Sequence, residues 1–110
     1  MMKKKKESVS FGVIGLGRFG TALAITLAQS GKEVIAVDRD ENQVKVLRQY
    51  TDYAFVANTI NSDTLKEIGI QNCDVVAVCI GEKIDASILI TMSVIDLGVP
   101  KVIAKASSVE

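Results

Sequence analysis

The 110-residue chain contains no histidine and no tryptophan, one proline and only two cysteines. The absence of histidine excludes Ser-His-Asp and Cys-His catalysis, and it removes the commonest metal ligand in proteins. Cys73 and Cys79 match neither a C-x-x-C pair nor a zinc-binding spacing, and each lies at or in an apolar segment. We therefore predict two buried, reduced thiols, which is consistent with a cytosolic protein.

Long apolar runs and an excess of one charge are also absent. No segment approaches the roughly 20 apolar residues that cross a bilayer, and no apolar stretch follows the lysines at residues 3–6 as a secretory signal would require. Thirteen basic residues balance thirteen acidic ones, so we expect no nucleic-acid partner. We interpret residues 1–8 as a disordered basic tail, with a weak membrane-surface or partner contact as the alternative.

Strand-like and helical patterns alternate along residues 9–110, which are enough for one domain. Because the connections are short, the alternation predicts a Rossmann-like, doubly wound α/β fold with a parallel sheet and helices on both faces. Right-handed crossovers favour the strand order 3-2-1-4-5. Such folds often continue with another helix and strand, so we expect the sequence to be a truncated piece of a longer protein. The predicted strands span residues 11–15, 33–38, 54–57, 74–80 and 101–106, and the predicted helices span residues 18–30, 41–50, 62–68 and 84–97.

A glycine-rich loop connects the first predicted strand to the first predicted helix. Residues 15–20 are GLGRFG and have the spacing G-x-G-x-x-G, which is weak alone but here follows a strand and opens a helix. Gly15 would permit the tight turn, Gly17 the close approach of a phosphate, and Gly20 the close packing of helix on sheet. Backbone N–H groups and the helix dipole would bind the phosphate.

An acidic residue at the end of the second strand extends this prediction to an adenosine site. Asp38 lies 18 residues beyond Gly20, where a carboxylate can accept hydrogen bonds from both ribose hydroxyls. The same charge repels a 2′-phosphate and disfavours NADP. Arg39 could soften that exclusion, although we favour a solvated surface arginine, and Asp40 is a possible N-cap of the next helix. The alternative is a nucleotide-free α/β domain with a glycine turn.

Arg18 inside the loop separates the candidate nucleotides. Its guanidinium could pair bidentately with phosphate oxygens. Backbone N–H groups already satisfy the pyrophosphate of a dinucleotide, so the γ-phosphate of ATP would benefit most. We therefore favour ATP and ADP over NAD(H), and an exposed first-turn arginine without a ligand is the alternative.

Three later segments follow strands at the same predicted edge of the sheet, where open α/β folds bind ligands. Asn58 and Thr59 follow the third strand, and an amide there could reach the adenine. Gly81, within residues 81–83, would permit close backbone approach, and Lys105 would add positive charge. Taken individually, each segment is as compatible with an ordinary loop as with a nucleotide-binding segment.

The fourth predicted helix carries apolar residues on two faces. One face should cover the sheet, and a helix that is apolar on two faces normally has a second partner. We predict that the face containing Ile90 contacts another subunit, with cover by residues beyond Glu110 as the alternative. The two faces consist of Ile84, Ile88, Met92 and Ile95, and of Ala86, Ile90, Val94 and Leu97.

Four features together are typical of a known family. They are the glycine loop, Asp38, the Ala57-Asn58-Thr59 sequence and the segment at residues 99–106. From Phe11 onward the sequence resembles the N-terminal lobe of RCK domains, also called KTN or TrkA-N domains. More closely, it is similar to the regulatory subunits of bacterial Ktr-type potassium transporters.

The resemblance implies an adenine-nucleotide-sensing regulatory domain, not an enzyme. Such a domain binds ATP and ADP competitively, and NAD(H) binding also occurs in the family. The resemblance further implies a homodimer or homo-octameric ring against a membrane potassium-translocating subunit. The expected location is therefore cytoplasmic, at the inner face of the cell membrane. The family's crossover helix and C-terminal lobe have no counterpart in this sequence.

The resemblance also implies roles for individual residues. Arg18 would sense the γ-phosphate within its own subunit or across a dimer, Asp38 would hold the ribose, and Asn58 would lie near the adenine. The full set of candidate nucleotide-binding residues is Gly15, Gly17, Arg18, Phe19, Gly20, Asp38, Arg39, Asp40, Ala57, Asn58, Thr59, Gly81, Glu82, Lys83, Lys105, Ala106 and Ser107.

Two other functions remain open from the sequence. One is the cofactor-binding half of an NAD-dependent dehydrogenase, although neither a histidine nor a second domain is present to handle a substrate proton. The other is a nucleotide-sugar-binding or NAD-binding repressor domain.

Overall fold

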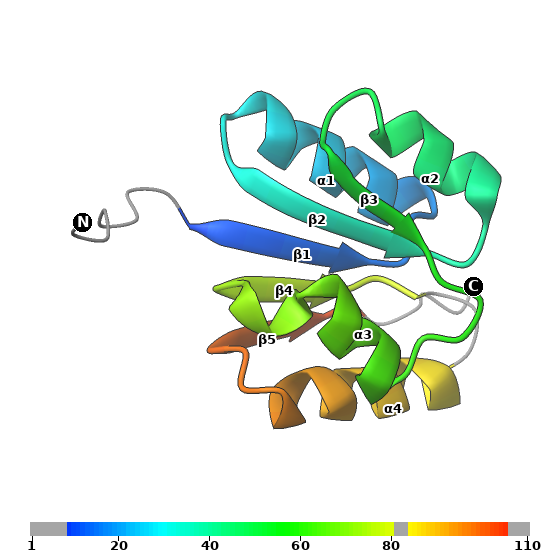
Figure 1. Cartoon of the computed structure of the whole chain (residues 1–110), viewed down its shortest axis with the longest axis vertical. Helices are drawn as coiled ribbons and strands as arrows, with labels where there is room; N and C mark the ends of the chain where they lie inside the picture. Colours follow the sequence, from blue (N-terminus) through cyan, green and yellow to red (C-terminus); the bar gives the residue numbers. More distant parts are fainter. Residues whose placement is uncertain (1–8, 81–83, 106–110) are drawn as a thin grey trace.

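A computed structural model describes residues 9–80 and 84–105 of the chain (Figure 1). Five parallel strands form one sheet in the order β3-β2-β1-β4-β5, which confirms the predicted fold class and strand order. The tail predicted over residues 1–8 lies outside the described residues. The strands are β1 (Ser10–Ile14), β2 (Glu33–Asp38), β3 (Tyr53–Val56), β4 (Val75–Val78) and β5 (Lys101–Ala104).

The helices cover both faces of this sheet, α1 and α2 on one side and α3 and α4 on the other (Figure 1). Alternate strand residues point to opposite faces, and each face therefore has its own core. On β1, for example, Val13 packs with α1 and α2, whereas Ile14 packs with α3 and α4. The helices are α1 (Arg18–Gln29), α2 (Glu41–Leu47), α3 (Ser62–Ile68), the short 3₁₀ helix η1 (Ile70–Asn72) and α4 (Ile84–Asp96).

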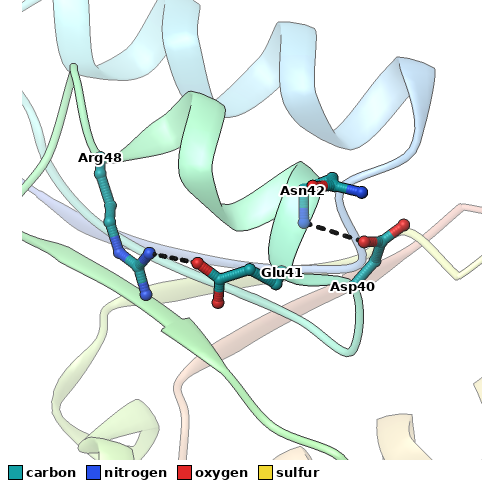
Figure 2. Close-up of polar contacts among 4 residues, drawn as sticks. All are labelled: Asp40, Glu41, Asn42 and Arg48. Carbon is teal, nitrogen blue, oxygen red and sulfur yellow. Dashed lines mark hydrogen bonds and ion pairs between the residues drawn. The ribbon is translucent and has the colours of Figure 1, made fainter.

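Local capping chemistry fixes where two of the helices begin. Asp40 is the N-cap of α2, as expected, and its carboxylate accepts a 2.9 Å hydrogen bond from the backbone N–H of Asn42 (Figure 2). In the same helix, Arg48 and Glu41 form an exposed ion pair at 2.8 Å. Asn61 caps α3 in the same way.

Several element boundaries differ from the sequence prediction. The helix predicted over residues 41–50 ends at Leu47, because the following N–H groups bond to carbonyls three residues back and tighten the chain into a turn. The strands predicted over residues 74–80 and 101–106 are shorter within the described residues, and η1 was not predicted. Both cysteines are buried thiols and form no disulfide, as predicted.

The structure corrects the prediction for the two faces of α4. Ile90 is 7% exposed, and together with Val94 it packs against β4 in the core. Ile88 on the other face is 52% exposed, and its neighbours Leu89, Met92 and Ile95 are exposed as well. The face containing Ile90 therefore covers the sheet and is not available to another subunit. None of the helices within residues 9–80 and 84–105 is long and apolar enough to span a membrane.

Two isoleucines of α4 allow a matched test of this packing. Ile90→Ala should lower the free energy of unfolding by about 2–4 kcal/mol, because it opens a cavity in the core. Ile88→Ala makes the same chemical change on the exposed face and should cost no more than about 0.5 kcal/mol. Urea denaturation of both variants measures the difference. Equal losses would mean that α4 packs on the sheet through another face.

Candidate functional site

A cleft of about 520 Å³ opens at the carboxyl edge of the sheet. The helices after β1 and β2 lie on one face of the sheet, whereas those after β3 and β4 lie on the other (Figure 1). The chain therefore diverges between the adjacent strands β1 and β4, at the switch point where open α/β folds bind ligands. The cleft is lined by Gly15, Leu16, Gly17, Asp38, Arg39, Asp40, Gln43, Asn58, Ile60, Cys79 and Ile80.

Two glycines of the loop are required by the protein's own packing. Gly15 has φ +98°, and a Cβ there would lie 2.9 Å from the backbone of Cys79. A Cβ on Gly20 would overlap the carbonyl oxygen of Gly15. Only glycine at both positions lets α1 begin directly against the turn that follows β1.

Gly17 differs from these two glycines. Its φ is −75°, which any residue adopts, and a Cβ there would meet no atom within 4 Å. The fold itself therefore does not require glycine at this position. Open space beside a backbone at the cleft is what the close approach of a phosphate needs.

The first turn of α1 lacks the side-chain cap that α2 and α3 have. Gly17 occupies its N-cap position, and no acidic side chain lies in the first turn. The first N–H groups of a helix have no acceptor within the helix, and its N-terminus carries a partial positive charge. Gly17 lines the cleft, so an anion bound beside it would lie next to these donors and complete the cap.

Asp38 lies at the carboxyl end of β2 and contacts the glycine loop. Its carboxylate accepts a 2.6 Å hydrogen bond from the N–H of Leu16 and a 2.8 Å bond from the N–H of Asp40. Its carbonyl oxygen accepts a bond from the N–H of Ala57, which holds the end of β3 beside it. The acid, the loop and the exit from β3 are thus assembled at one edge.

Arg18 does not line the main cleft. It is exposed and lines a shallower hollow beside Thr21 and Ile25. Gly17 and Gln43 border both hollows, so Arg18 lies next to the cleft and outside it.

A basic side chain that follows β5 contacts an aromatic side chain of the glycine loop. The Nζ atom of Lys105 lies 5.3 Å from the centre of the Phe19 ring, in a cation–π contact. Burial raises the pKa of the Cys79 thiol above its usual range, and the nearby charge of Lys105 partly lowers it. Positive charge therefore lies at the β4 side of the loop as well.

The structure brings together part of the predicted site. Five predicted residues, Gly81, Glu82, Lys83, Ala106 and Ser107, lie outside the described residues. Six others adjoin the cleft without lining it, namely Arg18, Phe19, Gly20, Ala57, Thr59 and Lys105. The remaining six line the cleft: Gly15, Gly17, Asp38, Arg39, Asp40 and Asn58.

Five lining residues were missed by the sequence analysis. Cys79 and Ile80 directly follow β4, and the predicted position of that strand beside β1 could have identified them. Leu16 lies inside the glycine motif. Gln43 and Ile60 carry no sequence signal, because only the packing of α2 and of the loop after β3 brings them to the cleft.

The described part of the chain contains no cluster of acidic and thiol groups suited to holding a metal ion. The site therefore offers backbone N–H donors, carboxylates and a partly apolar wall formed by Ile60 and Ile80. This combination suits a phosphorylated nucleoside, whose phosphate, ribose and base need those three environments respectively.

The fold and this cleft define the class of nucleotide-binding Rossmann domains. The sequence model of one family within that class, the TrkA-N domain, matches residues 11–110, and the chain belongs to this family. The resemblance to the N-terminal lobe of RCK domains is thereby confirmed.

Two curated relatives match almost the whole chain. The chain is 41% identical over 104 residues to the Ktr system potassium uptake protein C of Bacillus subtilis, which covers 94% of the chain and 46% of the relative. It is 41% identical over 103 residues to the Ktr system potassium uptake protein A of Vibrio alginolyticus, covering 94% and 47% respectively. The chain thus spans about half the length of these relatives. A glycerol-3-phosphate dehydrogenase [NAD(P)+] of Yersinia pestis matches 52% of the chain, and 17% of its own length, at 41% identity.

Solved structures confirm the fold at low sequence identity. The TrkA-N domain of the inner membrane protein YbaL from Escherichia coli superposes with a TM-score of 0.73 at 19% identity, covering 90% of this chain and 73% of that one. The NAD(P)-binding domain of an exopolyphosphatase-related protein from Archaeoglobus fulgidus gives 0.75 at 20% identity, covering 91% and 74%.

Substitutions at two glycines of the loop should differ in their effect on the free energy of unfolding. Gly20→Ala should lower the free energy of unfolding by about 2–3 kcal/mol, because the new methyl group overlaps backbone rather than a side chain that can move. Gly17→Ala, the control three residues away, should change the unfolding free energy by less than about 1 kcal/mol. Urea denaturation distinguishes them, and a large loss in Gly17→Ala would show that the fold itself needs glycine there.

Proposed function

We propose that this chain is an adenine-nucleotide-sensing regulatory domain of a potassium-transport system and not an enzyme. The observation that carries the proposal is that one cleft contains both Asp38 and the glycine loop, at the start of a helix without a side-chain cap. The chain that forms this cleft is 41% identical to Ktr system proteins over almost its whole length. Differential affinity of a nucleotide for two arrangements of neighbouring subunits would transmit its presence. A tenfold effect requires a coupling free energy of only ~1.4 kcal/mol.

ATP and ADP are the proposed nucleotides, with NAD(H) as the second candidate. Arg18 supports the first choice because it lies beside Gly17 at the rim of the cleft, where a third phosphate would project from the loop. Within the described residues, the Arg18 guanidinium forms no ion pair with a carboxylate. The exposed side chain is therefore available to pair with a phosphate at the rim of the cleft. NAD(H) is supported by proteins of the same fold, such as the V8 variant of the imine reductase of Myxococcus stipitatus in complex with NAD⁺, at a TM-score of 0.69 and 22% identity.

The cofactor-binding half of a dehydrogenase is the alternative function. The match to glycerol-3-phosphate dehydrogenase favours it, but that match covers only 52% of the chain, whereas the Ktr system proteins cover 94%. The chain also has no histidine to transfer a substrate proton. We therefore rank the regulatory function first.

Calorimetric titration with ATP, ADP, NADH, NAD⁺ and NADPH tests the proposed ligand. We expect ATP and ADP to bind competitively and NADPH to bind weakest, because its 2′-phosphate would meet Asp38. Arg18→Ala should weaken ATP about tenfold while changing ADP less, since one charge-assisted bond to the γ-phosphate is lost.

Arg48→Ala is the matched control for this titration. Arg48 is an exposed arginine that pairs with Glu41 on α2, and its removal should leave all affinities unchanged. NADH binding far tighter than ATP, together with an unchanged ATP affinity in Arg18→Ala, would overturn the assignment of the γ-phosphate role. Absence of binding by every adenosine ligand would overturn the proposed function itself.

We also propose that the domain assembles with copies of itself, as a dimer or octameric ring, at the cytoplasmic face of a membrane potassium-translocating subunit. The support is the exposed apolar face of α4, formed by Ile88, Leu89, Met92 and Ile95. An exposed face of this kind on a helix normally has a partner.

Association is testable by sedimentation velocity. Met92→Glu places a charge in the exposed face of α4 and should shift any oligomer toward the 11.8 kDa monomer. Lys45→Glu on α2 is a surface control and should leave the sedimentation coefficient unchanged. If Met92→Glu associated as well as the unmodified chain, this face would not be the contact.

A further inference from the structure

Asp38 has hydrogen-bond partners before any ligand binds. Its Oδ2 atom accepts the N–H of Leu16 at 2.6 Å, and its Oδ1 atom accepts the N–H of Asp40 at 2.8 Å. The first bond joins residues that are 22 apart in the sequence and connects the end of β2 to the middle of the glycine loop. A carboxylate has about four acceptor positions, so two remain for ribose hydroxyls.

The position of Leu16 gives this bond its importance. Leu16 lies between Gly15, whose N–H donates to the carbonyl oxygen of Val37 in β2, and Gly17, the N-cap of α1 that borders the cleft. The carbonyl oxygen of Leu16 accepts the hydroxyl of Thr21, so both backbone groups of this residue are held by side chains. Its side chain is fully buried. The hydrogen bond to Asp38 thus fixes the direction in which the following N–H groups point.

We propose that Asp38 is a positioning residue for the phosphate loop, in addition to the ribose acceptor that the proposed function assigns to it. Its carboxylate holds Leu16 so that the uncapped N–H groups of α1 face the phosphate before the ligand arrives. A donor set that is already ordered binds an anion more tightly, because less conformational freedom is lost on binding. This inference rests on the proposed function, since it concerns the same cleft.

The positioning role makes a prediction of opposite sign to simple electrostatics. Asp38 is negative, and its removal on charge grounds alone should strengthen the binding of an anion nearby. If Asp38 orders the loop, its removal should instead weaken anion binding, even for an anion that has no ribose. Inorganic tripolyphosphate is such a probe, because it carries the phosphates of ATP and nothing else.

Asp40 supplies the charge-matched control. Its carboxylate lines the same cleft, yet it bonds to Asn42 at the start of α2 and not to the glycine loop (Figure 2). Asp40→Asn removes the same charge, and asparagine is an equally good N-cap, so α2 should be preserved.

Calorimetric titration of the chain with tripolyphosphate, in parallel with adenosine, is the test. Asp38→Ala should weaken tripolyphosphate about tenfold. Asp40→Asn should tighten it about twofold to threefold. Adenosine affinity should fall in Asp38→Ala, because the ribose acceptor is lost. Asp38→Asn retains the volume of the side chain, and it should give a smaller loss of the same sign if the alanine variant does not fold.

Hydrogen exchange at the Leu16 amide gives a readout that needs no ligand. The amide should exchange slowly in the unmodified chain and in Asp40→Asn, and markedly faster in Asp38→Ala or Asp38→Asn at equal global stability. Unchanged exchange would overturn the positioning role even if no nucleotide bound. Nucleotide binding with tripolyphosphate affinity raised equally by Asp38→Ala and Asp40→Asn would overturn the positioning role while leaving the proposed function intact.

Discussion

The close approach of backbone to backbone at Gly15 and Gly20 is the constraint on which the rest of the structure depends. The turn after β1 passes so near the end of β4 that a Cβ on Gly15 would lie 2.9 Å from the backbone of Cys79, and α1 begins against the same turn. This approach lets α1 start at the sheet edge, with its N-cap residue Gly17 lining the cleft. If either position carried a side chain, the helix would have to move away from the turn after β1.

The cleft follows from this constraint together with the topology. Because α1 and α2 lie on one face of the sheet and α3 and α4 on the other, the chain diverges at the carboxyl ends of β1 and β4 (Figure 1). Asp38 lines this cleft and is hydrogen-bonded to the glycine loop. Its carboxylate accepts the N–H of Leu16 and retains further acceptor positions. In the proposed function, this one group therefore serves both the phosphate loop and the ribose.

Much of this arrangement was predictable from the sequence. The alternation of strand and helix patterns predicted the parallel sheet, and the right-handedness of its crossovers predicted the strand order. The glycine spacing with Asp38 predicted the edge at which the cleft lies. The interior of the cleft was less predictable. Gln43 and Ile60 reach it only through the packing of α2 and of the loop after β3, and neither residue type is a nucleotide signal. The hydrogen bond between Asp38 and Leu16 joins distant residues and has no local pattern at all.

Local sequence patterns are sufficient to predict the fold class and the glycine loop, because both depend on local periodicity and on the unique conformational freedom of glycine. Tertiary structure alone decided which face of α4 is buried. The two faces have similar apolar content, and only the rotation of the helix against β4 places Ile90 inside and Ile88 outside. It also decided that Arg18 lies beside the cleft, since the direction of α1 relative to the sheet is a global property that no short motif encodes.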